Sequence, residues 1–254
     1  MKNRILYASQ ALTYLGVIKG AIYLIANKLK IHILLSAKIR NFRIYVRTCS
    51  PDLSIAIENL VNGEFQELPV RLISEQKGLI IDGGSYIGTS AIALNELFPG
   101  KKIICVEPHK GNFEVLQKNT KNYKNIEVIN AALAPMGIMS AKLHDRTREF
   151  GFTIVTPNKN FVSSREIGDI NCISIEDIML THSVIELALL KLDIEGGELQ
   201  ILKNSKDWIS AVFCIYIELH DRIIPGCTNT FLNATRKMQI WPTESEKLCR
   251  IRNH

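Results

Sequence analysis

The sequence predicts an α/β fold built on a doubly wound, largely parallel β-sheet. From residue 78 onward, apolar segments of strand length alternate with segments of helical length, which is the pattern of strands joined by covering helices. A glycine-rich turn, "DGGSYIG", follows the first of these strands. The 254 residues are 46% hydrophobic and 22% charged, so the chain can bury a full core and disorder is not expected.

Five strands are expected in the alternating region. They cover residues 79–82, 103–107, 126–130, 187–193 and 212–219. The segments "SAIALNELFP", "NFEVLQKNTKNY" and "GGELQILKNSKDW" follow three of these strands and read as helices. Residues 137–178 interrupt the alternation, where "IMSAKLHD" and "FGFTIVTP" predict a β excursion.

Shorter elements are expected before and after this region. "FRIYVRT" alternates like a strand, and "DLSIAIENLVNG" reads as a helix with Asp52 near its start and Gly63 just past its end. Near the C-terminus, "NTFLNATRK" predicts a helix, and "MQIW" and "KLCRIR" predict two strands that complete the sheet.

The N-terminal part differs from the rest in charge, and we expect a basic, apolar helical arm over residues 1–42 and a main domain over 43–254. Residues 1–51 contain nine Lys and Arg side chains and no acidic one, whereas the remainder contains 22 basic and 25 acidic residues. Because the main domain is near neutral, nucleic acid is not an expected partner.

The apolar segment at residues 5–27 allows three interpretations. Its length would permit a membrane span, but Lys19 near its middle would be costly in the bilayer. A basic amphipathic helix lying on an anionic membrane surface is one alternative, and a helix packed on the main domain or on a partner is the other. The six cysteines form no CxxC pair, which favours a reducing, cytoplasmic location, with peripheral contact at the inner membrane face left open.

The glycine-rich turn does not match the common phosphate-binding patterns. It has neither G-x-G-x-x-G nor GK[ST], but reads D-x-G-x-x-x-G. The glycines allow the backbone to approach a ligand, while a carboxylate favours a cationic ligand over a phosphate. The residues expected to bind the cofactor in this turn are Asp82, Gly83, Gly84, Ser85, Tyr86 and Gly88.

An acidic residue, Glu107, ends the next strand, where an acid in this kind of sheet binds ribose hydroxyls. A ligand with an adenosine, a positive charge and no pyrophosphate is S-adenosylmethionine, which is the expected cofactor. The alternatives are a degenerate NAD-binding turn and a turn that binds nothing.

Four segments of the sequence resemble a known family. "LLKLDIEGGELQIL" is the most specific, and it occurs with "IDGGSYIGTS", "VEPHKGNFEVLQKN" and "NAALAP". Together they resemble the FkbM family of S-adenosylmethionine-dependent methyltransferases, over most of the chain beyond the basic arm. The resemblance implies a seven-stranded, Rossmann-like sheet whose last strand is antiparallel. It also implies methyl transfer, usually to a hydroxyl of a sugar, glycolipid or secondary metabolite, with a reduced lid or one built from residues 137–178.

Candidate catalytic residues lie at the carboxyl ends of the fourth and fifth strands, where ligands bind in such sheets. Asp193 and Glu195 could orient the acceptor or a base, hold a divalent cation or cap the following helix. Glu218 and His220 follow the fifth strand, and a histidine titrates in the range useful for a base, although it could also simply cap the strand end. We predict Asp193, Glu195 and His220 as catalytic residues and assign no metal ligand, although a divalent cation is possible.

The expected function is therefore O-methylation of a hydroxyl on a saccharide, glycolipid or secondary metabolite. Two alternatives remain open at this point. One is an N-methyltransferase or a small-metabolite methyltransferase, because the acceptor half of such enzymes is variable. The other is a non-catalytic binding module that keeps the fold.

Overall fold

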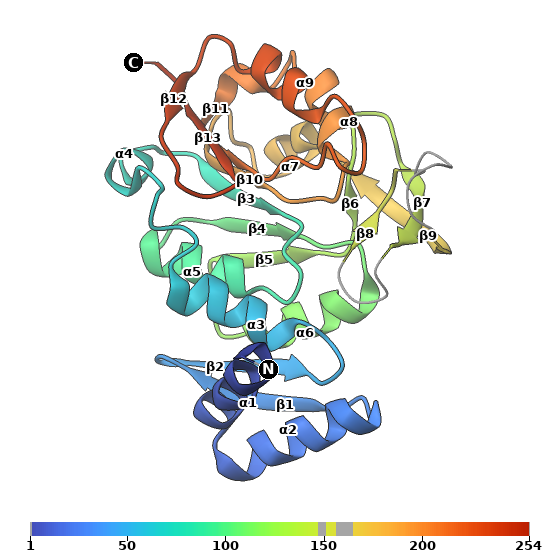
Figure 1. Ribbon diagram of the computed structural model, residues 1–254. Coiled ribbons are helices and arrows are strands. Elements are labelled where there is room, and N and C mark those ends of the chain that lie inside the picture. Colours follow the sequence, from blue (N-terminus) through green and yellow to red (C-terminus); the bar gives the residue numbers. More distant parts are fainter. Residues whose placement is uncertain (1, 147–150, 156–164, 254) are drawn as a thin grey trace.

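The computed structural model describes residues 2–146, 151–155 and 165–253, and its centre is a seven-stranded sheet (Figure 1). The strand order is β12-β13-β11-β10-β3-β4-β5. The strands are β3 (Leu79–Gly83), β4 (Ile103–Val106), β5 (Ile126–Ile129), β10 (Leu187–Leu192), β11 (Val212–Ile217), β12 (Gln239–Trp241) and β13 (Leu248–Ile251). Five strands are parallel, and β13 runs antiparallel to both of its neighbours. The predicted fold class is confirmed, including the antiparallel last strand.

Helices cover both faces of this sheet because its central strands are apolar on both sides. In β3, Ile80 packs in one core with Ile92 and Leu116, and the next residue, Ile81, points to a second core. The first face carries α5 (Thr89–Leu97) and α6 (Lys110–Thr120). The second carries α7 (Ile175–Thr181), α8 (Glu198–Lys203) and α9 (Cys227–Ala234), with the short turn η2 (Ile209–Ala211) leading into β11.

The N-terminal unit, residues 2–47, forms a further layer beneath α5 and α6 (Figure 1). It contains α1 (Lys2–Leu15), α2 (Val17–Leu29), β1 (Leu34–Ile39) and β2 (Phe42–Arg47). β1, which we did not predict, pairs with β2 in an antiparallel hairpin, and the predicted boundary at residues 42/43 lies at the start of β2. Within the described residues, no helix combines the length and apolarity needed to cross a membrane.

The N-terminal unit shares its core with the main domain, so it is not a detached arm. Ala11 of α1 and Tyr23 of α2 are fully buried in the same cluster as Ile80 and Leu116. Lys19, which makes a membrane span costly, instead donates to Ser36 Oγ of β1 at 2.7 Å. The expectation that the apolar segment packs on the main domain is met by the inner face of these helices.

The segment after β2 reaches the edge of the parallel sheet. Helix α3 (Asp52–Ile57) continues into one turn of π-helix, η1 (Glu58–Asn62), and α4 (Val70–Ser74) follows. Gly63 ends this helix in the left-handed conformation, with φ of 80°, as predicted.

A small second sheet lies beside the carboxyl end of β5. It contains β6 (Ala132–Leu133), β7 (Ser140–Asp145), β8 (Phe152–Thr153) and β9 (Arg165–Ile173), in the order β6-β9-β7-β8. The predicted β excursion is thereby confirmed where residues 137–178 are described. It brings Phe152 and Ile154 to the wall of the cavity at the carboxyl end of the large sheet.

Candidate functional site

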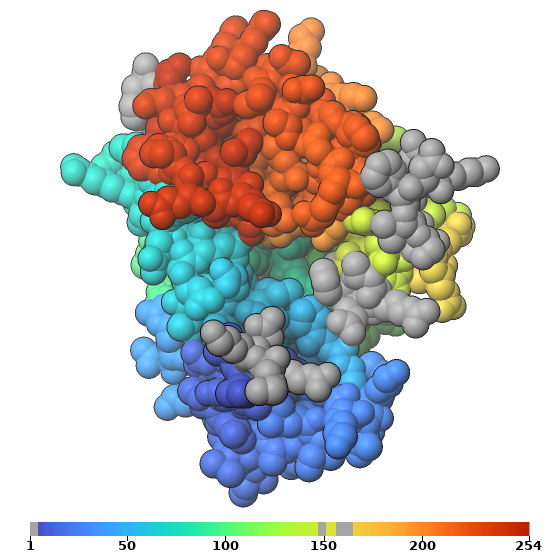
Figure 2. All heavy atoms as spheres, viewed as in Figure 1, coloured from blue at the N-terminus to red at the C-terminus, as the bar shows by residue number. Residues whose placement is uncertain are grey.

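One cavity of about 960 Å³ lies at the carboxyl ends of the parallel strands. Figure 2 shows the recess between the C-terminal part of the chain, in orange and red, and the light-blue segment that contains α3 and η1. The glycine end of the cavity is lined by Gly84, Ser85, Tyr86, Glu107, Pro108, Leu133 and Phe152. The acidic end is lined by Glu64, Asp193, Glu195, Glu218 and Lys247.

Asp82 does not face the cavity, which corrects the role that we expected for it. Its side chain is fully buried, and Ser90 Oγ donates to its Oδ2 at 2.6 Å. Lys191 Nζ lies 3.0 Å from its Oδ1, because Lys191 of β10 and Asp82 of β3 are register partners in neighbouring strands. The Asp82 charge is therefore neutralised within the protein and cannot be the direct attraction for a cationic ligand.

The Asp82–Lys191 pair supports the turn itself. Lys191 Nζ also donates to the carbonyl oxygen of Gly84 at 2.9 Å, and Lys191 lines the cavity floor. Lys191 was missed by the sequence analysis, although a single lysine in the apolar strand "LALLKL" is a signal that a buried partner exists.

Glycine is needed in this turn where the backbone passes close to a neighbouring segment. A Cβ at Gly84, whose φ is 75°, would lie 1.9 Å from the carbonyl oxygen of Asp193. Gly84 is therefore required for the turns after β3 and β10 to meet at the cavity floor. Gly83 and Gly88 lie outside the lining; Gly83 ends β3, and Gly88 precedes α5, where a Cβ would meet Leu116.

Glu107 lies at the end of β4, where it was predicted, and its carboxylate is held by the protein. Its Oε1 accepts from His109 N at 2.9 Å and from Asn112 Nδ2 at 3.2 Å, and its Oε2 accepts from Tyr86 N at 2.9 Å. A carboxylate has about four acceptor positions, so Oε2 retains one for a ligand hydroxyl. Burial raises the pKa of Glu107 to about 7, although these donors oppose the rise.

A network from the N-terminal unit fixes Tyr86, which has a positive φ of 50°. The Tyr86 hydroxyl donates to Asp52 Oδ1 at 2.6 Å, and Arg47 Nε donates to Asp52 Oδ2 at 2.9 Å. Arg47 Nη2 also donates to Asn112 Oδ1 at 2.9 Å, so one arginine contacts both supports of the glycine end. Sequence reasoning missed Arg47, Asp52 and Asn112 because their partners are distant in the chain.

The acidic end brings together the residues predicted after β10 and β11. Asp193, Glu195 and Glu218 all line the cavity. Glu195 has a positive φ of 52°, a conformation that costs a non-glycine residue about 1–3 kcal/mol and persists mainly at functional sites. Burial and the neighbouring Asp193 charge raise the pKa of Glu218, and burial also raises the pKa of Glu195. Lys191 and Lys247, in contrast, hold the pKa of Asp193 below its usual value despite burial.

His220 lies behind these carboxylates and is absent from the cavity lining, so it cannot take a proton directly from a ligand there. Its Nδ1 lies 2.9 Å from Glu198 Oε1, and Glu198 in turn accepts from Ile194 N and Gly196 N. Burial lowers the pKa of His220. The hydrogen bond to Glu198 and the charges of Glu198, Asp193 and Glu195 raise it by more than burial lowers it, so the pKa is about 9. Because its ring lies behind the carboxylates, His220 is not placed to act as the general base that we expected.

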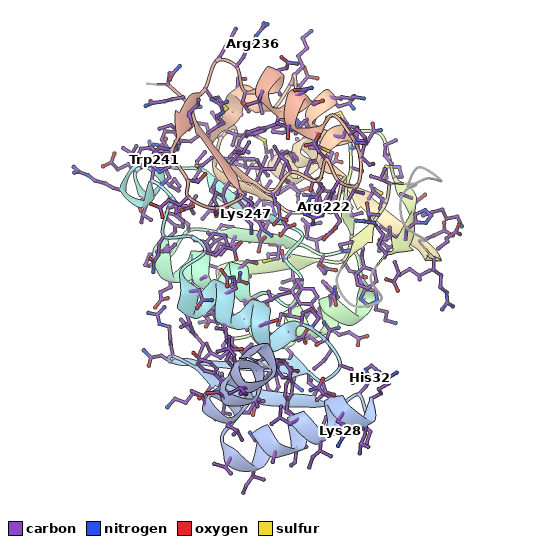
Figure 3. All side chains as sticks on the ribbon, in the orientation of Figure 1. Lys28, His32, Arg222, Arg236, Trp241 and Lys247 are labelled. Carbon is purple, nitrogen blue, oxygen red and sulfur yellow. The ribbon has the colours of Figure 1, made fainter. Side chains whose placement is uncertain are left out.

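Three basic residues border the acidic end. Lys247 forms an ion pair with Glu64 and lies 3.7 Å from Glu218 Oε2, and Arg146 Nη1 lies 3.1 Å from Glu195 Oε2. Arg222 lies 3.8 Å from Glu218, and Figure 3 shows Lys247 and Arg222 near the middle of the view, below the C-terminal segment. Lys247 and Glu64 were not predicted, because only folding brings the turn after η1 and the β12–β13 loop together.

Comparisons with known proteins identify a family model and several solved structures similar to the chain. The model of the "Methyltransferase FkbM domain" matches residues 82–239. No curated protein sequence matches the chain.

Solved structures similar to the chain include three distant ones. A methyltransferase FkbM from Methylobacillus flagellatus KT is 19% identical with a TM-score of 0.45, over 68% of this chain and 43% of that one. The Pyrococcus abyssi tRNA (uracil-54, C5)-methyltransferase is 10% identical with a TM-score of 0.39, over 86% of this chain and 43% of that one. A methyltransferase from Geobacter sulfurreducens is 9% identical with a TM-score of 0.42, over 81% and 91%.

The chain thus spans less than half the length of the first two structures. The family model, in contrast, covers more than half of the chain and includes the glycine turn, Glu107, and the Asp193 and His220 segments. The chain therefore belongs to the FkbM family of S-adenosylmethionine-dependent methyltransferases.

Proposed function

We propose that the chain transfers a methyl group from S-adenosylmethionine to a hydroxyl oxygen of a saccharide or glycolipid. The observation that carries this proposal is the polarity of the acceptor side of the cavity. Beside the acidic end, the lining includes amides, hydroxyls and carboxylates, from Asn59, Asn62, Gln66, Glu67, Thr243 and Ser245, next to the apolar side chains of Ile55, Ile194 and Pro242. Such groups can recognise a polyhydroxylated ligand by hydrogen bonds, while the neighbouring apolar side chains can contact the faces of a sugar ring.

The glycine end fits the methyl donor. The free acceptor position on Glu107 Oε2 suits a ribose hydroxyl, and Pro108, Leu133 and Phe152 provide an apolar wall next to it for the adenine. The donor supplies a methyl group already activated on a sulfonium. The protein therefore has to align the acceptor oxygen with that methyl and exclude water.

The acceptor hydroxyl also has to lose its proton, and Glu218 is the residue that we assign to this step. It lines the cavity, and burial raises its pKa, which makes it a stronger base than an exposed glutamate. Asp193 and Glu195 lie beside it and orient the hydroxyl. His220 acts behind them as a positioning residue.

The test is transfer of a tritiated methyl group from S-adenosylmethionine to total cell glycans and lipids. We expect label in a saccharide-containing fraction, in a form stable to base as a methyl ether is. Label on nitrogen or on a small metabolite would replace the proposed acceptor. Absence of donor binding by the purified protein, measured by calorimetry, would favour a non-catalytic module instead.

We also propose that the N-terminal unit docks on an anionic membrane surface. The outer face of α2 carries a stripe of large aliphatic side chains at helical spacing, namely Ile18, Ile22, Ile25 and Leu29. Ile18 is 78% exposed, so this stripe lies opposite the buried Tyr23 and Ala26. A helix that is apolar on both faces normally has a second apolar environment.

The charge around the stripe identifies that environment. Lys28 and Lys30 are exposed at the end of α2, and residues 1–51 contain no acidic side chain. Figure 3 shows Lys28 and His32 at the end of α2 remote from the large sheet. A basic rim around exposed aliphatic side chains is complementary to anionic lipid headgroups over acyl chains.

Liposome co-sedimentation tests this surface. We expect binding that needs an anionic phospholipid and weakens with salt. Replacing Ile18 and Ile22 by Glu should reduce binding about a hundredfold or more, because each buried isoleucine contributes about 1.5–3 kcal/mol. Leu180→Glu is the matched control, since Leu180 is 79% exposed on α7. A protein that dimerises through the stripe and ignores lipid would contradict the proposal.

A further inference from the structure

His220 has a buried ring nitrogen without a hydrogen-bond partner among the described residues. The His220 side chain is fully buried, and its Nδ1 is held by Glu198 Oε1 at 2.9 Å. Its Nε2 makes no hydrogen bond within the described part of the chain. Buried polar atoms are nearly always paired, so this atom indicates a ligand that is external to the protein.

The surroundings of Nε2 indicate the nature of that ligand. Glu218 Oε1 lies 3.5 Å from His220 Nε2, Asp193 Oδ1 lies 3.7 Å from it, and Glu195 Oε1 lies 3.9 Å from it. None of these contacts is a hydrogen bond. Two metal–ligand bonds of about 2.0–2.2 Å, however, separate donor atoms by roughly 3–4 Å. The ligand atoms of Asp193, Glu195 and His220 all lie within 4.8 Å of one another, close enough to share one cation.

The local charge is also suited to a divalent cation. Five carboxylates gather at this end of the cavity, from Glu64, Asp193, Glu195, Glu198 and Glu218. Three fixed cations lie among them, from Arg146, Arg222 and Lys247. The five carboxylates outnumber these three cations, and a bound divalent cation would offset the excess while displacing any proton from His220 Nε2.

We propose that Asp193, Glu195 and His220 bind one divalent transition-metal ion at the acidic end of the cavity. The imidazole nitrogen favours Mn²⁺, Fe²⁺ or Zn²⁺ over Mg²⁺ or Ca²⁺, which prefer oxygen ligands alone. The Glu198–His220 contact is the carboxylate–histidine arrangement that orients a metal-binding imidazole. Glu198 is therefore a positioning residue.

The open coordination positions face the cavity, because Asp193 and Glu195 line it and His220 lies behind them. A hydroxyl or a pair of neighbouring hydroxyls of the acceptor fits there, and a bound hydroxyl gives up its proton more easily to Glu218. This role in catalysis rests on the proposed function, whereas binding of the ion does not.

The test uses Mn²⁺ and the full chain, without donor or acceptor. We expect one tightly bound ion per chain. Binding is monitored by electron paramagnetic resonance, as loss of the six-line signal of free Mn²⁺. A nitrogen hyperfine coupling in the spin-echo spectrum is expected from His220, and carboxylate binding at the surface cannot produce it. Glu195→Gln should weaken binding at least about tenfold, and Glu198→Gln about 10–100-fold.

The matched control is Glu166→Gln with Asp169→Asn, which removes two exposed carboxylates beside Lys142, away from the cavity. It should leave Mn²⁺ affinity unchanged. Equal losses in the control and in Glu195→Gln, or bound Mn²⁺ without a nitrogen coupling, would overturn the site. Calorimetry with the donor separates the two proposals: donor binding without Mn²⁺ binding refutes the metal site alone, and Mn²⁺ binding without donor binding refutes the proposed function alone.

Discussion

The carboxylates at the two ends of the cavity differ in their partners. At the glycine end, Asp82 is paired with Lys191, and Glu107 accepts three hydrogen bonds from the protein. At the acidic end, Asp193 and Glu195 face His220 at distances that exceed a hydrogen bond. The carboxylates at the glycine end are held by partners within the protein, whereas the acidic end has more carboxylates than cations.

The difference distinguishes a preorganised donor site from a site whose charges await a ligand. A buried charge whose partners belong to the protein stabilises a fixed geometry, which a donor site needs in every turnover. A cluster whose carboxylates outnumber its cations can accept something supplied from outside, such as an ion or an acceptor hydroxyl. We therefore expect the methyl donor, which is the same in every turnover, at the glycine end, and the acceptor at the acidic end.

The largest effect is expected from Glu218→Gln at the acidic end. An amide cannot take the acceptor proton, so kcat should fall by about 10²–10⁴. The tritium transfer assay measures the rate, and calorimetry should show donor affinity close to that of the parent protein. If the variant retained its full rate, Glu218 would not be the base.

Next comes Lys191→Met at the glycine end, which leaves Asp82 buried without its cation. The free energy of unfolding should fall by about 3–5 kcal/mol, measured by urea denaturation. The double variant with Asp82→Asn removes the unpaired charge and should regain much of this loss. Additive losses in the double variant would show that the two side chains are not coupled.

A smaller effect is expected from Tyr86→Phe, which removes the hydroxyl donated to Asp52. A hydrogen bond to a charged group contributes about 1.5–3 kcal/mol, and the free energy of unfolding should fall by that amount. Tyr45→Phe is the control, because it retains the ring that lies 4.3 Å from Lys118 Nζ. Equal losses in both variants would indicate a general packing effect.

The smallest effect concerns the pH dependence of donor binding. Because burial raises the pKa of Glu107 to about 7, its carboxylate is charged above that pH and gains a proton as the pH falls through it. Donor affinity should therefore decrease by about tenfold one pH unit below 7, measured by calorimetry. Glu107→Gln should bind the donor weakly at every pH. If this variant kept the pH dependence of the parent protein, Glu107 would not be the titrating group.

Much of the large sheet could be predicted from the sequence, because its strands are continuous apolar runs separated by helices. The runs at β3, β4, β5, β10 and β11 were identified to within one or two residues. β1 was not, because "LLSAKI" follows an apolar helix without a clear change of pattern. The family resemblance, carried by the segments around Asp82, Glu107 and Asp193, is confirmed by the family model.

The sequence by itself determined which residues stand at strand ends, since period, turn residues and motif spacing are local properties. It could not determine which way those side chains point or what they contact. Asp82 turned inward because its register partner is a lysine, and His220 turned behind the carboxylates because Glu198 holds it. Such contacts join strands and turns far apart in the chain, so only tertiary packing decided them.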